Sequence, residues 1–223
     1  MIKKVLFLIT LIITTAYCQA QKPYITSDGE LILGFARINQ SGTEESSIPR
    51  FTMFFHAQSL THFDQSKNFG WFTGLGIRNV GFIYEQDAST RKKFRTYNVG
   101  VPIGLKFGDM NGLYFYGGYE LELPINYKEK TFINEKKEDK YNVWFSKRVP
   151  TIYNTVFVGV RFPRGVSLKF KYYLTPFFNT DYTQVINGIT QMPYANLDVN
   201  TFHIALTTMI SKGKKVMWIK RED

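Results

Sequence analysis

Strict two-residue alternation between residues 92 and 128 is the feature that most constrains how this chain can fold. Odd-numbered positions from Tyr97 to Phe107 are apolar, and the even-numbered positions between them are polar, glycine or proline. The same division runs from Leu113 to Ile125. Successive side chains of a β-strand point to opposite faces of the sheet. Residues 108–112, GDMNG, supply a turn. The segment therefore predicts a long antiparallel hairpin with one apolar face.

Six other segments of roughly ten residues carry the same alternation and complete a set of eight predicted strands. The apolar parity of one of them shifts near residues 79–81, which predicts a β-bulge. The segments are residues 30–38, 50–60, 69–85, 151–162, 166–177 and 200–210.

The connections between the predicted strands alternate in length, which is typical of outer-membrane barrels. We therefore predict an all-β fold, an eight-stranded antiparallel up-and-down transmembrane β-barrel that leaves no sheet edge unpaired. The longer connections are 39–49, 86–91, 129–149 and 179–199, and the shorter ones are 61–68, 108–112 and 163–165.

Residues 1–20 predict a cleaved secretory signal peptide, which leaves residues 21–223 as the barrel domain. Lys3 and Lys4 precede an apolar run that is too short to span a membrane as a helix. The single cysteine, Cys18, could instead be a lipoprotein acylation site. Tyr17 stands where such a site needs a small residue, which favours cleavage after Ala20. The mature chain then has no cysteine for disulfides or thiolate chemistry.

The formal net charge is +10. A basic chain can bind nucleic acid or an anionic membrane surface, and the export signal argues against nucleic acid. No long apolar segment follows the signal peptide, so we expect no transmembrane helix.

Three features predict that the apolar face of the barrel meets lipid. The polar face is rich in glycine, as in Gly100 and Gly104, and small residues suit the crowded interior of an eight-stranded barrel. The apolar face is bulky over about 11 residues, near the length needed to cross. Its ends carry aromatics such as Tyr97 and Phe107. The lumen would then hold a structural network of paired charges, without room for an aqueous channel. Its predicted members are Arg50, Arg78, Lys106, Glu120, Glu122, Arg161, Lys169 and Lys171.

The run 97–108, YNVGVPIGLKFG, with residues 114–124 and the strand containing Gly74-Leu75-Gly76, resembles the outer-membrane barrel domain of PorT-like proteins. The resemblance covers most of the mature chain and implies an eight-stranded barrel in a Gram-negative outer membrane. Some relatives are linked to protein secretion, but no secretion-specific motif is found here. Outer-membrane barrels often end on an aromatic residue, whereas residues 211–223 follow the last predicted strand.

Candidate catalytic and metal-binding groups are few. Glu120 and Glu122 share one strand face about 7 Å apart, which approaches glycosidase spacing, but an interior ion-pair network explains them better. The histidines lack metal-ligand spacing. Residues 74–79, GLGIRN, lack the third glycine and the helix of a dinucleotide fingerprint. We expect no cofactor.

The main hypothesis is a non-enzymatic integral outer-membrane barrel with a structural, adhesive or secretion-associated role. It would be surrounded by outer-membrane lipid, and loops 129–149 and 179–199 could bind an extracellular partner. One alternative is a soluble secreted or periplasmic barrel that binds an apolar ligand, as lipocalins do. Another is an acyl-modifying barrel hydrolase that would use Glu120, Glu122 and His56. The sequence does not indicate the oligomeric state.

Overall fold

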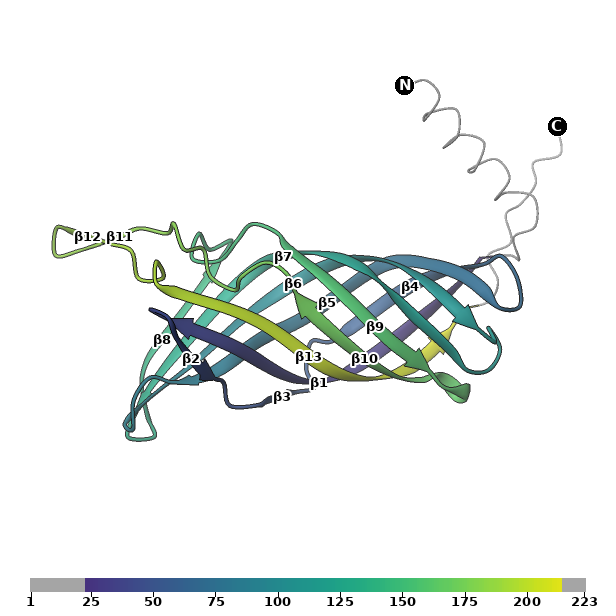
Figure 1. Cartoon of the computed structure of the whole chain (residues 1–223), viewed down its shortest axis with the longest axis horizontal. Helices are drawn as coiled ribbons and strands as arrows, with labels where there is room; N and C mark the ends of the chain where they lie inside the picture. Colours follow the sequence, from purple (N-terminus) through teal and green to yellow (C-terminus); the bar gives the residue numbers. More distant parts are fainter. Residues whose placement is uncertain (1–22, 214–223) are drawn as a thin grey trace, which may run out of the picture.

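Eight strands pair in an antiparallel ring, which closes where the last strand pairs with the first (Figure 1). The structure is a computed structural model that describes residues 23–213, so the predicted signal peptide lies outside the described residues. The predicted fold class is confirmed. The ring consists of β1 (Tyr24–Gln40), β4 (Ala57–Asp64), β5 (Phe69–Glu85), β6 (Thr90–Gly108), β7 (Tyr114–Ile133), β9 (Tyr153–Arg161), β10 (Val166–Tyr173) and β13 (Leu197–Lys212).

Shorter elements lie outside this ring. They are β2 (Thr43–Ser46), β3 (Arg50–Thr52), β8 (Lys136–Trp144), β11 (Gln184–Ile186), β12 (Ile189–Gln191) and a 3₁₀ turn at Pro163–Gly165. Among them, β11 and β12 form a separate two-stranded sheet. No helix in residues 23–213 has the length and apolarity to cross a membrane.

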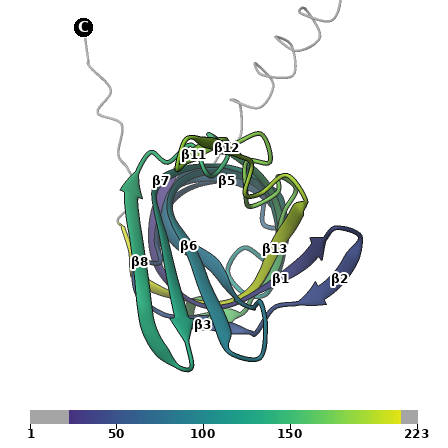
Figure 2. The ribbon, with the colours of Figure 1, turned by 90° about the vertical axis from the view of Figure 1, so that its left-hand side faces the viewer.

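The connections differ between the two ends of the barrel. At one end, residues 65–68, 109–113 and 162–165 make short turns. At the other end, which we call the loop end, β6, β7 and β8 extend outward and longer segments join the strands (Figure 1). The view along the barrel shows β8 leaning away from the ring beside β7 (Figure 2).

The apolar face of the barrel points outward. Val101, Ile103 and Leu105 are 50%, 57% and 48% exposed, whereas Pro102 and Lys106 between and beside them are buried. Contact with lipid would remove this continuous apolar surface from water. A soluble lipocalin-like barrel requires the reverse arrangement, with its apolar face inside.

Aromatic side chains gather at both margins of this apolar belt. At the short-turn end, the rings of Phe69 and Phe107 lie 5.2 Å apart. At the loop end, Phe55 packs edge-on against Tyr97 at 5.5 Å, and Trp144 is exposed nearby in β8. Aromatic girdles of this kind mark the two interfaces of membrane barrels.

The predicted strand 50–60 is broken in the structure. β3 pairs Thr52 with Ile32 of β1, and β4 resumes by pairing Ala57 with Gly29. Residues 53–56 therefore lie opposite only two residues of β1. Because the insertion adds an even number of residues, Thr52 and His56 both face inward as predicted. Phe54 was expected on the same inner face, but it lies in the break and is exposed.

The β-bulge predicted near residues 79–81 is wrong. The pairing of β5 with β6 keeps one register from Gly76 to Glu85. Val80, Phe82 and Tyr84 remain on the inner face with Arg78, and the interior itself changes from charged to aromatic at this height. The register shift in this part of the sheet lies between β6 and β7, opposite Tyr97 and Asn98.

The two longest predicted connections, 129–149 and 179–199, contain ordered structure. Most of residues 129–149 belong to β7 and β8, which form a long hairpin. Strand β10 ends at Tyr173, and the chain then folds back over the loop end. Phe177 and Phe178 are buried there against Phe82, and the buried Tyr194 ring stacks on Phe178. An aromatic plug therefore closes the loop end of the lumen.

Candidate functional site

Arg78 of β5 is the centre of a charged network inside the barrel. Its Nε donates to Glu30 Oε2 at 3.0 Å, and its Nη1 forms an ion pair with Glu120 and approaches Glu122 at 3.5 Å. Its Nη2 donates to the Gln58 side-chain oxygen at 2.8 Å. All these partners come from other strands, so one guanidinium joins β1, β4, β5 and β7 across the lumen.

Lysines from β10 complete the pairing of the three glutamates. Lys171 Nζ donates to Glu120 Oε2 at 2.7 Å and also pairs with Glu122. Lys169 pairs with Glu30. Tyr173 donates its hydroxyl to Glu122 Oε2 at 2.7 Å. Each carboxylate of this group therefore has at least two donors, as buried charges require.

Two further ion pairs lie toward the short-turn end. Arg161 donates two hydrogen bonds to Asp28, from Nη1 to Oδ2 and from Nη2 to Oδ1, each at 3.2 Å. Lys106 pairs with Asp64 and lies 3.3 Å from His62 Nδ1. Lumen charges therefore extend along much of the barrel interior.

Arg50 is the predicted member that lies apart from this network. Its guanidinium donates to the Asn79 side chain at 2.8 Å and to the Asn79 carbonyl at 3.4 Å. Within residues 23–213 it has no carboxylate within ion-pair distance. The short strand β3, rather than a continuous strand 50–60, carries it beside β5.

Sequence reasoning missed three acids that complete the network: Asp28, Glu30 and Asp64. With Glu120 and Glu122 they supply five carboxylates to five cations, so the paired groups are neutral in sum. A signal was present, because the predicted set held six cations but only two carboxylates. Glu30 also alternates with the apolar Leu31 and so falls on the inner face.

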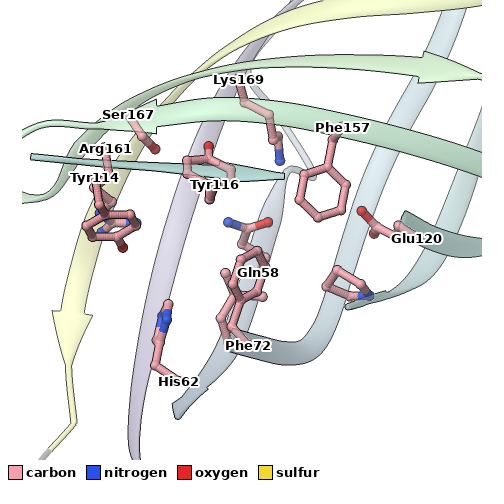
Figure 3. Close-up of a pocket in the computed structure, with 12 residues that line it drawn as sticks. Gln58, His62, Phe72, Tyr114, Tyr116, Glu120, Phe157, Arg161, Ser167 and Lys169 are labelled. Atoms are coloured by element: carbon pink, nitrogen blue, oxygen red, sulfur yellow. The ribbon is translucent and has the colours of Figure 1, made fainter. Parts of the chain in front are cut away.

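The charged network lies between two aromatic layers. Toward the short turns, Phe72, Tyr116 and Phe157 pack together, with ring centroids 6.0–6.3 Å apart. These rings line a small cavity, shown with its neighbours in Figure 3. The centre of a water molecule can occupy about 20 Å³ of this cavity. That volume holds about one water. Toward the loops, the aromatic plug covers the network.

The three histidines are buried and contact other side chains or backbone groups of the interior. Lys106 donates to Nδ1 of His62, so Nε2 of His62 carries the ring proton. This Nε2 donates to the Thr26 hydroxyl at 3.0 Å. The Asn79 backbone N–H donates to Nδ1 of His56 at 3.4 Å. The His203 ring is tilted against the Tyr173 ring, with centroids 6.0 Å apart. Residues 23–213 contain no group of His, Cys, Asp and Glu that could hold a metal ion.

A second cavity, of about 260 Å³, opens at the loop end beside the plug. Arg148 donates to the Tyr194 hydroxyl at 3.0 Å and to Gln184 at 3.1 Å, which ties two loop segments together. Burial raises the pKa of the Tyr194 phenol, so it is neutral at physiological pH.

An apolar outer belt and a charged interior define the chain as an integral outer-membrane β-barrel protein. No family model and no curated protein matches the chain. It is similar to Ail, the attachment invasion locus protein of Yersinia pestis, with 9% identity and a TM-score of 0.40 over 86% of this chain and 99% of Ail. It is also similar to Neisserial surface protein A, with 12% identity and a TM-score of 0.37 over 85% of this chain and 97% of that protein. The outer membrane protein OprG of Pseudomonas aeruginosa has 9% identity to the chain and a TM-score of 0.35, over 87% of this chain and 96% of OprG.

Proposed function

We propose that this protein is a non-enzymatic outer-membrane barrel that works through its outer surface and loops, not through its lumen. Its role would be structural, adhesive or secretion-associated. The sealed interior is the observation that carries this proposal. At most 1% of the side-chain surface of Arg78, Glu122 and Lys171 is exposed. A solute would have to break several buried ion pairs and pass two aromatic layers to cross.

The same contacts argue against catalysis in the lumen. Glu120 and Glu122 both bind Lys171 and Arg78, so neither carboxylate is free to take up or deliver a proton. His56 is bound to Thr52 and the Asn79 backbone. A hydrolase built on these residues would need them to face a substrate site.

We further propose that the chain is a PorT-like barrel, on the strength of the 97–108 and 114–124 segments. Some of those relatives are linked to protein secretion, and we include this role as a candidate although the sequence contains no secretion-specific motif. An extracellular partner would meet the loop end. The β11–β12 hairpin presents Val185, Ile189 and Met192 there, all exposed. The β7–β8 hairpin is another exposed element at this end.

Planar-bilayer recording tests the sealed lumen. We expect purified wild-type protein, shown to be folded by its heat-dependent shift on a gel, to insert without producing conductance steps. Reproducible steps of fixed amplitude would contradict the proposal. A parallel assay with acyl-ester substrates should give no turnover above a preparation that has been boiled and not refolded. Turnover by the folded protein would restore the hydrolase hypothesis.

A further inference from the structure

Three neighbouring strands carry a basic surface at the loop end. Lys93 of β6 pairs with Lys130 of β7, which pairs in turn with Lys140 of β8. Side chains of directly opposed residues lie on the same face of a sheet. The rows on either side are Arg91–Phe132–Lys137 and Arg95–Lys128–Asn142. We call the seven cations of these rows the basic ladder: Arg91, Lys93, Arg95, Lys128, Lys130, Lys137 and Lys140.

The basic ladder faces outward and continues the apolar belt. On β6, the odd-numbered face passes from Val101 and Val99 through Tyr97 to Arg95 and Lys93. Successive positions on one face lie about 7 Å apart along a strand, and neighbouring strands about 4.8 Å apart. The ladder therefore begins about one row beyond the aromatic margin, on the strand extensions seen in Figures 1 and 2.

The protein does little to neutralise these charges. Among residues 23–213, Arg91 is the only member of the ladder within ion-pair distance of a carboxylate, that of Glu135. Like charges that lie directly opposite each other destabilise a sheet. The row Lys93–Lys130–Lys140 places three of them side by side. The interior network, by contrast, is fully paired.

Two aromatic rings hold part of the ladder in place. Arg91 and Lys93 lie 5.4 and 5.0 Å from the centre of the Phe132 ring. Arg95 and Lys128 lie 5.7 and 5.0 Å from the centre of the Tyr97 ring. Cation–π contact holds these side chains against the sheet, so less freedom is lost when an anion binds them.

We propose that the basic ladder binds the phosphates of anionic lipid headgroups in the leaflet around the loop end. An amphiphile matches both halves of this surface, with acyl chains against Val99 and Val101 and phosphate on the lysines and arginines. A soluble polyanion would use only the cationic half. The inference rests on the membrane-spanning barrel of the proposed function and adds a specific lipid site to it.

Lipid binding by matched charge variants tests this proposal. The ladder variant carries Lys93→Gln, Lys130→Gln and Lys140→Gln. The control variant removes the same charge at exposed lysines elsewhere, with Lys67→Gln, Lys147→Gln and Lys212→Gln. The wild type and both variants are placed in detergent micelles, and their affinities for lipid A, which carries phosphate, and for phosphatidylcholine are compared at two salt concentrations.

We expect the ladder variant to lose about tenfold or more in lipid A affinity, with a weaker dependence on salt, and the control variant to stay within about twofold of wild type. Equal losses in the two variants would overturn the site. Soluble heparin that binds the ladder as tightly as lipid A and displaces it would overturn the lipid in favour of a polysaccharide. Heat-dependent gel mobility shows whether each protein has folded into a barrel before lipid binding is compared. A wild-type protein that never folds in micelles would contradict the proposed function itself.

Discussion

Arg78 of β5 and Glu120 of β7 form an ion pair across β6, the strand that lies between theirs. Gly100 of β6 makes this possible. A Cβ atom added at Gly100 would overlap Glu120 Oε1 and lie 3.2 Å from Arg78 Nη1. The glycines of the inner face thus create the space in which charges from alternate strands meet, and the lumen is filled without a channel.

Removing the central guanidinium should be strongly destabilising. In Arg78→Met, the carboxylates of Glu30 and Glu120 lose a buried partner, which should cost about 3–5 kcal/mol. The measurement is the urea midpoint of unfolding in detergent, followed by mobility on unheated gels. Lys67→Met, at an exposed turn position, is the control. Equal midpoints for the two variants would show that the network contributes little to stability.

A methyl group at Gly100 should also be costly, because it displaces the Glu120 carboxylate from its partners. We expect Gly100→Ala to lower the free energy of unfolding by about 1–3 kcal/mol. Gly117→Ala is the matched control on the outer face, where the nearest atom to an added Cβ lies at 3.3 Å. The account is contradicted here if both variants unfold at the same urea concentration.

Val101 lies near the middle of the apolar belt and is half exposed. Arginine at this position would have to enter the hydrocarbon, at a cost of about 2–4 kcal/mol. Unfolding of Val101→Arg in lipid vesicles should show this loss, whereas Asn111→Arg in an exposed turn should unfold like wild type. An unchanged midpoint for Val101→Arg would mean that this face does not contact the bilayer.

The aromatic plug should behave as a hydrophobic core. Phe178 is buried against Phe82, Phe94 and Tyr194, and the Tyr194 ring stacks on it at 4.3 Å. Phe178→Ala should therefore cost about 3–5 kcal/mol. Val185→Ala, at the exposed β11–β12 hairpin, should change stability by less than about 0.5 kcal/mol. If differential proteolysis or urea unfolding finds Phe178→Ala as stable as Val185→Ala, the plug is not a packed unit.

Strand number and facing could be predicted from the sequence because each depends on local alternation. The pattern from Tyr97 to Phe107 fixes which side chains share a face, whatever the partner strands are. The interior beyond the belt could not be read in this way. The apolar residues Val80, Phe82 and Tyr84 resemble a shift of parity in the sequence. A pattern that records only whether each position is apolar or polar cannot distinguish a β-bulge from an interior whose side chains become aromatic.

The plug and the network depend on contacts between distant segments. Phe177 and Phe178 are near the end of a predicted strand, and Tyr194 is in a polar loop, so alternation gives no reason to place them inside. Charge balance is the better guide to the network. Six predicted interior cations required more acids than Glu120 and Glu122, and the inner parity of the first strand points to Glu30.

Oxygen accessibility along β6 tests the account most directly. Single cysteines at positions 97, 99, 101, 103, 105 and 107, each carrying a spin label, are measured in lipid vesicles with oxygen and with a water-soluble nickel reagent as collision partners. We expect oxygen contact to peak near Val101 and Ile103 and to fall toward Tyr97 and Phe107, with nickel contact varying in the opposite sense. Uniformly high nickel contact at all six positions would show that this face lies in water, and the membrane-spanning barrel would be contradicted.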